Sequence, residues 1–364
     1  MNAAATGELS PQGSVSAAGQ PGSATPAQLE PRQSRGPFTQ KVRQRFGRGA
    51  DQYEQEARLQ QAMAWRLARL CADLPLPAGP RADLGSGTGL LSRALQRHHR
   101  ELRQRPPLQL DLCPELLARN PLARLSGPLP GLDVHSDVHS GVHSGLLSKL
   151  GSDPASDGPN DHGPRRPGAG GSRGQTLVSQ NPLFGSDSDS PASDSNHDRP
   201  NGLIWDLNGG LPDALHDAAL LVSSFALQWL EDPARSLAQW CQRLGPGGWL
   251  VLAVPTAGSF SQWRQAAAAA AVPCTALALP DAAAVLAASG ARGLRPQRQA
   301  LLRFSQATPD ALACLRQLKA VGAGTSRQAP LSPGQWRRLR SHWPSPACLN
   351  WEVLLLLAQR DPCV

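Results

Sequence analysis

The chain has 364 residues, a length typical of two domains, yet its 35 glycines and 34 prolines indicate that much of it does not pack into a core. No apolar run approaches the roughly 18–20 residues of a membrane span, and no basic and apolar leader opens the sequence, so we expect a soluble protein without a transmembrane helix or signal peptide. The formal net charge of +8 favours acidic partners.

Two stretches have the composition of segments that do not fold on their own. Residues 1–35 are rich in Ala, Gly, Pro, Gln and Ser, and residues 126–200 mix Ser, Asp, Gly, Pro and His. Such sequences bury too little apolar surface to offset their ordering entropy. We therefore expect a disordered tail and a disordered, low-complexity insertion, which divides one α/β domain of about 250 residues into 36–125 and 201–364.

Neither the histidines nor the cysteines predict a metal site. A tandem repeat over 133–144 places His135, His139 and His143 four residues apart, which would align three imidazoles on a helix. Its Val, Gly and Ser content disfavours a helix, so we interpret the repeat as a duplicated linker. The seven cysteines include no Cys-x-x-Cys pair, which disfavours zinc and a disulfide framework and leads us to expect a reducing, cytoplasmic compartment.

The expected elements alternate along the chain. Apolar residues at three- and four-residue spacings predict one helix over 38–70. Further helices are expected from Leu90 onward and over 115–119, 213–216, 233–244, 261–271, 281–289, 310–320 and 333–343. Strands are expected over 81–84, 108–112, 202–206, 218–224, 249–254, 301–304 and 349–358. This order predicts a doubly wound, Rossmann-like, mostly parallel sheet, in which the last two strands could form an antiparallel edge.

A glycine-rich turn joins the expected strand 81–84 to the following helix. The dinucleotide fingerprint would need a small residue at position 90, which is Leu, and the observed pattern is Asp-x-Gly-x-Gly-x-Gly. An acid two residues before the first glycine suits the methionine ammonium of S-adenosyl-L-methionine (SAM), directly or through water; a purely structural tight turn is the alternative. The cofactor-binding candidates in this turn are Asp83, Gly85, Ser86, Gly87 and Gly89.

Two further acids end neighbouring strands. Asp111, followed by Leu112, lies 24 residues after Gly87, close to the spacing expected for a carboxylate that binds ribose hydroxyls. Asp206 and Leu207 would present a carboxylate to the adenine amino group and an apolar side chain to its ring. Ser223, near the end of the strand over 218–224, completes the cofactor-binding candidates.

These residues resemble the class I SAM-dependent methyltransferases over 81–125 and 201–304, and the turn Leu-Gly-Pro-Gly-Gly over 244–248 is similar to a signature of that family. Two departures are the shortage of β-branched residues in 81–84 and Ala219, where family members often have an acid. Residues 46–54, 224–229 and 315–323 resemble a narrower group, the malonyl-acyl-carrier-protein O-methyltransferases of biotin synthesis. The insertion is the largest departure from that group.

The resemblance implies methyl transfer to a carboxylate that is already ionised at pH 7, so no general base is required. It also implies a helical N-terminal lid that carries Tyr53, an acceptor pocket lined by Gln228 and Trp229, and Arg316 or Lys319 at the malonyl group or the phosphopantetheine phosphate. Each has a simpler structural alternative, as a core residue for Tyr53 and Trp229 and as a solvated side chain for the two cations.

The basic residues fall in two clusters. Residues 31–48 hold six basic residues and no acid, and residues 291–340 hold ten against Asp310 alone. With the resemblance, this predicts that the surface from Arg292 to Arg340, together with Arg43 and Arg45, docks an acidic acyl carrier protein. No nucleic-acid motif is present. The alternative for this surface is a solvated face without a partner. The alternatives for the function are another small-molecule methyltransferase, or a non-catalytic SAM-fold protein that binds an acidic partner.

Overall fold

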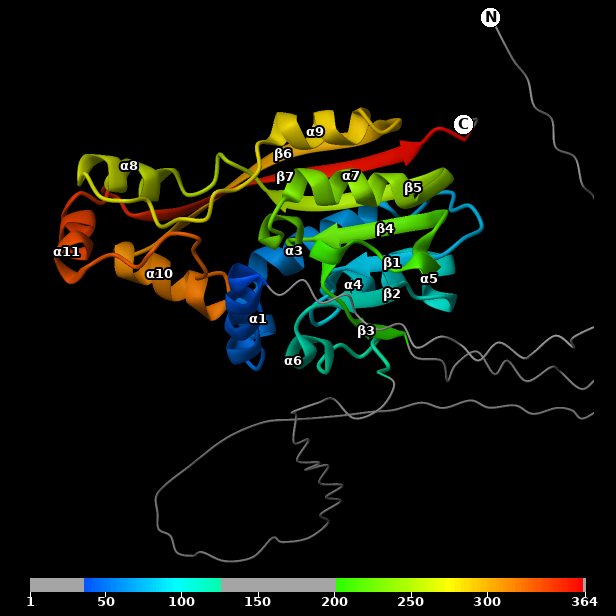
Figure 1. Ribbon diagram of the computed structural model, residues 1–364, viewed down its shortest axis with the longest axis horizontal. Helices are drawn as coiled ribbons and strands as arrows, with labels where there is room; N and C mark the ends of the chain where they lie inside the picture. Colours follow the sequence, from blue (N-terminus) through cyan, green and yellow to red (C-terminus); the bar gives the residue numbers. More distant parts are fainter. Residues whose placement is uncertain (1–35, 126–200, 363–364) are drawn as a thin grey trace, which may run out of the picture. The chain divides into compact units, whose positions relative to one another are not determined.

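A mixed sheet organises residues 36–125 and 201–362, which the computed structural model describes (Figure 1). Its seven strands have the order β3-β2-β1-β4-β5-β7-β6; β7 runs antiparallel to both neighbours and the other pairs are parallel. The strands are β1 (Arg81–Leu84), β2 (Leu108–Asp111), β3 (Gly202–Ile204), β4 (Ala218–Ser224), β5 (Leu244–Pro255), β6 (Leu294–Ala307) and β7 (Cys348–Arg360). The doubly wound, mostly parallel sheet with an antiparallel edge is confirmed.

Helices cover both faces of this sheet, and β4 and β5 are therefore buried on both sides. The helices are α1 (Pro37–Gly49), α2 (Tyr53–Glu56), α3 (Arg58–Leu70), α4 (Leu90–His98), α5 (Arg100–Gln104), α6 (Pro114–Leu117), α7 (Pro233–Arg243), α8 (Ser261–Ala269), α9 (Ala282–Gly290), α10 (Ala311–Ala320) and α11 (Pro333–Ser341). Leu220 and Val222 of β4 pack under α3, α4 and α5, whereas Leu221 packs with α7 and α9 on the opposite face. Alternate strand residues thus supply two separate cores.

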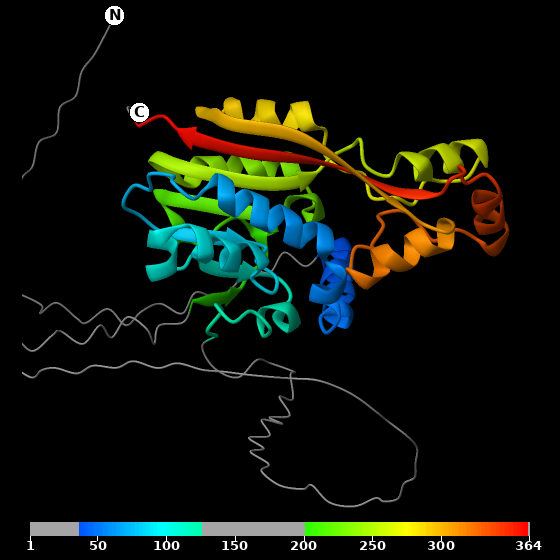
Figure 2. The ribbon, with the colours of Figure 1, turned by 180° about the vertical axis from the view of Figure 1, so that it is seen from behind.

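A third core lies beyond the main sheet. β7 continues past its pairing with β5, and β6 pairs with it as far as Ala307. Figures 1 and 2 show α8, α10 and α11 gathered at this end of the β6–β7 pair. Trp263, Leu318, Leu339 and Leu349 pack together there. None of the described helices is long and apolar enough to cross a membrane.

Several predicted elements are wrong in extent. The single helix over 38–70 is instead three helices, separated by a turn at 50–52 and a break at Ala57. The strand predicted over 301–304 is the longer β6, whose mostly exposed residues show little apolar periodicity and whose extent follows from pairing with β7. The helix over 213–216 is a short 3₁₀ turn. The tail, the insertion and its histidine repeat lie outside the described residues.

The basic residues of the surface predicted over 291–340 are spread over several elements. β6 has 14 residues, which corresponds to about 45 Å at the usual rise per residue. Arg292 precedes β6 and Arg298 lies in its first half, whereas Arg337 and Arg338 lie on α11. Figure 1 shows α9 and α11 toward opposite ends of the β6–β7 pair. The role of this surface in docking stays a prediction.

Candidate functional site

The glycine turn after β1 opens one side of the candidate site. Gly85 and Gly87 have φ values of +73° and +53°, which residues other than glycine rarely adopt. A Cβ on Gly85 would lie 2.3 Å from the Cβ of Ala226. Glycine is therefore required where the turn passes the segment after β4.

Asp111 at the end of β2 is fixed by this turn. The backbone N–H of Gly87 donates to its Oδ2 over 2.8 Å, and that of Cys113 donates to its Oδ1 over 2.7 Å. Burial raises the pKa of Asp111 to about 6, against the lowering effect of these bonds. The Asp111 carboxylate is thus largely ionised at neutral pH, and its remaining lone pairs can accept hydrogen bonds from the hydroxyl groups of a ligand.

Asp206 follows β3 at the same edge of the sheet. Its Oδ1 accepts bonds from the backbone and side-chain amide of Asn208, at 2.9 and 2.8 Å. Burial raises the pKa of Asp206, and the bonds from Asn208 lower it. Leu207 is buried beside it. Because parallel strands end at a common edge, the two carboxylates and the glycine turn share one cavity.

This cavity has an empty volume of about 700 Å³ and includes Gly85, Gly87, Asp111, Leu112, Asp206 and Leu207 in its wall. We refer to it as the cofactor cavity. Ser224 also lines it, and the Ser224 hydroxyl is buried without a hydrogen-bond partner. Two carboxylates at strand ends, an apolar side chain and a glycine cradle fit the ribose, adenine and amino-acid parts of SAM.

Four sequence-predicted residues lie behind this wall. Asp83 accepts a 2.7 Å bond from the Ser92 hydroxyl beneath the glycine turn, so the expected direct contact with an ammonium group is not supported. Ser223 donates to the carbonyl of Leu84 and is fully buried. Strand alternation instead turns Ser224 to the cavity. Ser86 and Gly89 also lie outside the wall.

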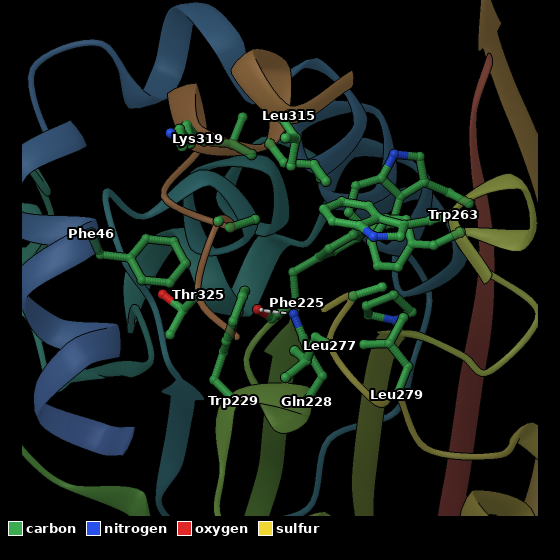
Figure 3. Close-up of a pocket in the computed structure, with 18 of the residues that line it drawn as sticks. Phe46, Phe225, Gln228, Trp229, Trp263, Leu277, Leu279, Leu315, Lys319 and Thr325 are labelled. Carbon is green, nitrogen blue, oxygen red and sulfur yellow. Dashed lines mark hydrogen bonds between the residues drawn. The ribbon is translucent and has the colours of Figure 1, made fainter. Parts of the chain in front are cut away.

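A second cavity adjoins the first, with an empty volume of about 690 Å³ (Figure 3). We refer to it as the acceptor cavity. Phe46, Tyr53, Phe225 and Trp229 line both cavities. Phe46 meets the ring of Trp229 edge-on with centroids 5.4 Å apart, and that of Tyr53 with centroids 6.3 Å apart. The shared wall is therefore aromatic.

Tyr53 begins α2, immediately after the turn that follows α1. Burial, and then the nearby charge of Asp111, raise the pKa of Tyr53 well above its ordinary value. Its phenol therefore stays protonated throughout the physiological range and is available to donate a hydrogen bond. This supports the predicted placement of Tyr53 at the site.

The other acceptor candidates separate into two groups. Gln228 lines the acceptor cavity, and its Nε2 donates to the carbonyl of Phe225. Its Oε1 is buried and has no partner in the described part of the chain. Lys319 lines the outer part of the cavity, where Figure 3 shows it at the opposite side from Gln228. Arg316 is exposed and belongs to neither cavity, because it lies on another face of α10. Its predicted role at the malonyl group is not supported.

Sequence reasoning missed several residues of the acceptor wall. Phe46 begins the first block that resembles the narrower family, so its signal was present. Trp263 of α8 and Thr325, in the loop after α10, carry no local signal. Both are buried, and within 36–125 and 201–362 the Trp263 Nε1 and the Thr325 Oγ1 have no hydrogen-bond partner. The projecting β6–β7 pair brings them to the site.

Comparison with known proteins places this geometry in context. No protein-family model matches the sequence. The chain is 29% identical over 315 residues to the biotin biosynthesis bifunctional protein BioCD of Bordetella avium, an alignment of 85% of this chain and 50% of that protein. It is 32% identical over 169 residues to the malonyl-[acyl-carrier protein] O-methyltransferase of Alcanivorax borkumensis, covering 42% of this chain and 54% of that protein. The chain thus spans about half the length of these curated relatives.

Among solved structures, magnesium protoporphyrin IX methyltransferase from Synechocystis is similar over 89% of this chain and 100% of that one, with 12% identity and a TM-score of 0.44. These values are too low to support a function. The strand order and the cofactor edge agree with the fold expected from the sequence motifs. The chain therefore has a doubly wound, Rossmann-like, mostly parallel sheet, and its sequence is similar to that of curated proteins named for biotin synthesis and malonyl-[acyl-carrier protein] O-methyl transfer.

Proposed function

We propose that this protein transfers a methyl group from SAM to the free carboxylate of a malonyl group on an acyl carrier protein, giving the methyl ester. The observation that carries the proposal is the aromatic wall shared by the cofactor and acceptor cavities. A methyl donor in one cavity and an acceptor in the other would meet where the two cavities adjoin, beside Phe46, Tyr53 and Trp229. The names of the two curated relatives support the substrate.

The cofactor cavity would hold SAM through three groups. Asp111 would accept bonds from the ribose hydroxyls, Asp206 would accept one from the adenine amino group, and Leu207 would pack on the adenine ring. SAM supplies an electrophilic methyl group on its sulfonium. Asp83 would act only indirectly, by holding the helix after the glycine turn through Ser92.

In the acceptor cavity, the chain would contribute alignment and exclusion of water rather than acid-base chemistry. A carboxylate is already anionic at pH 7, so the attacking oxygen needs no base. In-line attack requires that oxygen to lie roughly 3–3.5 Å from the methyl carbon. The Tyr53 hydroxyl and the Gln228 side chain would orient the malonyl group, and the surrounding aromatic rings would exclude water.

The test is transfer of labelled methyl from SAM to malonyl-acyl carrier protein, compared with malonyl-coenzyme A. We expect the label on the carrier thioester, and we expect mild alkali to release it as methanol, which identifies a methyl ester. SAM binding without transfer to either thioester would contradict the proposed substrate but leave SAM as the proposed cofactor. Label that is stable to alkali would overturn esterification.

A further inference from the structure

A groove between α1 and α10 adjoins the acceptor cavity. The groove and the cavity share Trp263, Thr275, Leu315, Lys319, Gly324 and Thr325. The empty volume of the groove, including open solvent, is about 1330 Å³. The groove therefore lies between solvent and the acceptor cavity.

The outer part of this groove is cationic. Lys41, Arg45 and Arg48 project from α1, Lys319 projects from α10, and no acidic residue lines the groove. None of these four side chains pairs with a carboxylate within the described ranges 36–125 and 201–362. Four cations without a neutralising carboxylate, on two facing helices, attract an anion. A single arginine guanidinium can donate two parallel hydrogen bonds to one phosphate.

The inner part of the groove holds polar groups that lack partners. Thr325 and Trp263 are 6% and 7% exposed, and the Thr325 Oγ1 and Trp263 Nε1 have no hydrogen-bond partner among the residues that the structure describes. Buried polar groups normally have one. Both residues line the passage from the groove to the acceptor cavity. An occupant with amide or carbonyl groups at this depth would satisfy them.

We infer that this groove docks an acidic acyl carrier protein by binding the phosphodiester and the amide-bearing arm of its phosphopantetheine group. The types of side chain met from the mouth of the groove inward follow the order of the chemical groups along such an arm. Cations lie at the mouth, partnerless polar groups follow, and the apolar cavity comes last. This inference rests on the proposed function and names the surface through which its substrate enters.

The groove includes only part of the docking surface predicted by sequence. Of that set, Arg45 and Lys319 line the groove, whereas Arg292 precedes β6 and Arg298 lies in its first half, and neither lines the groove. The structure therefore supplies a matched pair of variants. Arg45→Glu with Arg48→Glu and Arg292→Glu with Arg298→Glu make the same change in net charge on different surfaces.

The experiment measures kinetics of the full chain with three malonyl thioesters, those of the carrier, coenzyme A and pantetheine. Reversal of Arg45 and Arg48 should raise the KM for malonyl-carrier at least tenfold at low salt and flatten its salt dependence, with kcat within threefold. The KM for the phosphate-bearing coenzyme A thioester should rise less, and that for the pantetheine thioester should not change. The Arg292 and Arg298 reversal should change none of these constants.

An unaltered KM for malonyl-carrier in the groove variant would overturn the docking site, as would an equal rise in the control variant. A second variant, Thr325→Val, tests the arm. It removes a hydroxyl that lacks a partner, so the folded protein should unfold at an unchanged or higher temperature. The KM for all three thioesters should nevertheless rise about three- to tenfold, and an unchanged KM would exclude the Thr325 contact.

Calorimetry separates this inference from the proposed function. Phosphopantetheine-bearing carrier without a malonyl group should bind wild type and bind the groove variant at least tenfold more weakly. If wild type methylates none of the thioesters but shows this binding difference, the proposed function fails and the docking site stands. If wild type methylates the carrier thioester but the two proteins bind the carrier equally, the docking site fails alone.

Discussion

Gly322, just after α10, packs against the ring of Phe46 on α1. Its φ is +72°, and a Cβ at this position would lie 2.6 Å from the Phe46 Cδ1. Phe46 in turn meets Tyr53 and Trp229 edge-on in the wall between the two cavities. The glycine in the late sequence block thus determines how closely α1 approaches α10 beside the acceptor cavity.

Substitution Gly322→Ala should separate α1 from α10. The Cβ would meet the Phe46 ring and the positive φ would strain an L residue, so we expect a loss of about 1–3 kcal/mol in the free energy of unfolding. Hydrogen exchange should increase in α1, and the KM of the methyl acceptor should rise.

The matched control for this change is Gly334→Ala on α11. A Cβ there has no heavy atom within 4 Å, and the residue lies in a helix, so the substitution should be neutral or slightly stabilising. If both variants showed the same exchange in α1, the Phe46 contact would not hold the lid.

Substitution Asp111→Asn should weaken SAM binding. It removes the charge from an acceptor that already holds two backbone N–H groups in place. Each lost bond to a charged group is worth about 1.5–3 kcal/mol, which corresponds to roughly a 10- to 150-fold rise in the Kd measured by calorimetry.

Ser223→Ala provides the comparison for the cofactor cavity. Ser223 is buried near the end of β4, at the same edge of the sheet as Asp111, but its hydroxyl donates to the carbonyl of Leu84 and it does not line the cavity. We expect a loss of stability of about 1 kcal/mol with an unchanged Kd for SAM. An unchanged Kd in folded Asp111→Asn would remove Asp111 from the cofactor site.

Substitution Tyr53→Phe tests the hydroxyl separately from the ring. The ring and its contact with Phe46 remain, so SAM affinity should stay within threefold of wild type. Loss of one neutral hydrogen bond to the acceptor should lower kcat/KM by about 3- to 10-fold. Tyr53→Ala should lower it further because it also opens the wall to water. Wild-type kinetics in Tyr53→Phe would restrict this residue to packing.

Asp83 should make stability depend on pH. Burial raises the pKa of Asp83 from 3.8 to about 7 in the folded protein, so the folded state binds its proton more tightly than the unfolded state. Its favourable contribution is complete below pH 4 and is lost as pH rises through about 7.

The neutral variant Asp83→Asn should therefore gain stability relative to wild type as pH rises from 5 to 8, by roughly 3 kcal/mol, because about two pH units of the shift fall in this range. Urea unfolding of both proteins at several pH values measures the difference. A difference that stays constant between pH 5 and 8 would show that Asp83 does not titrate in this range.

Replacement of residues 126–200 by a short Gly/Ser linker should preserve the enzyme. The two ends of this stretch meet, since the N–H groups of Asn201 and Gly202 donate to the carbonyl of Arg124 at 3.0 and 3.1 Å. A short loop closes such a gap at little entropic cost. We expect methyl transfer within threefold of the full chain; loss of folding or activity would assign these residues a required role.

The cofactor edge was accessible from sequence because its signals are local. Gly85 and Gly87 follow one strand, while Asp111 and Asp206 end the next two. In a parallel sheet, the carboxyl ends of such strands converge whatever the details of packing. Those four residues accordingly line one cavity. The choice between Ser223 and Ser224 was not local, because it depends on which face of β4 meets the cavity, and a shift of one residue reverses the face.

The acceptor cavity was decided by tertiary structure. Phe46 and Trp229 carried sequence signals, but Trp263 and Thr325 reach the same wall only because β6 and β7 extend beyond the sheet and hold α8 and α10 there. The sequence by itself determined the order of strands and the position of the cofactor turn, since both follow from short-range periodicity and glycine conformation. The acceptor wall depends on long-range strand pairing, which no local pattern in the chain encodes.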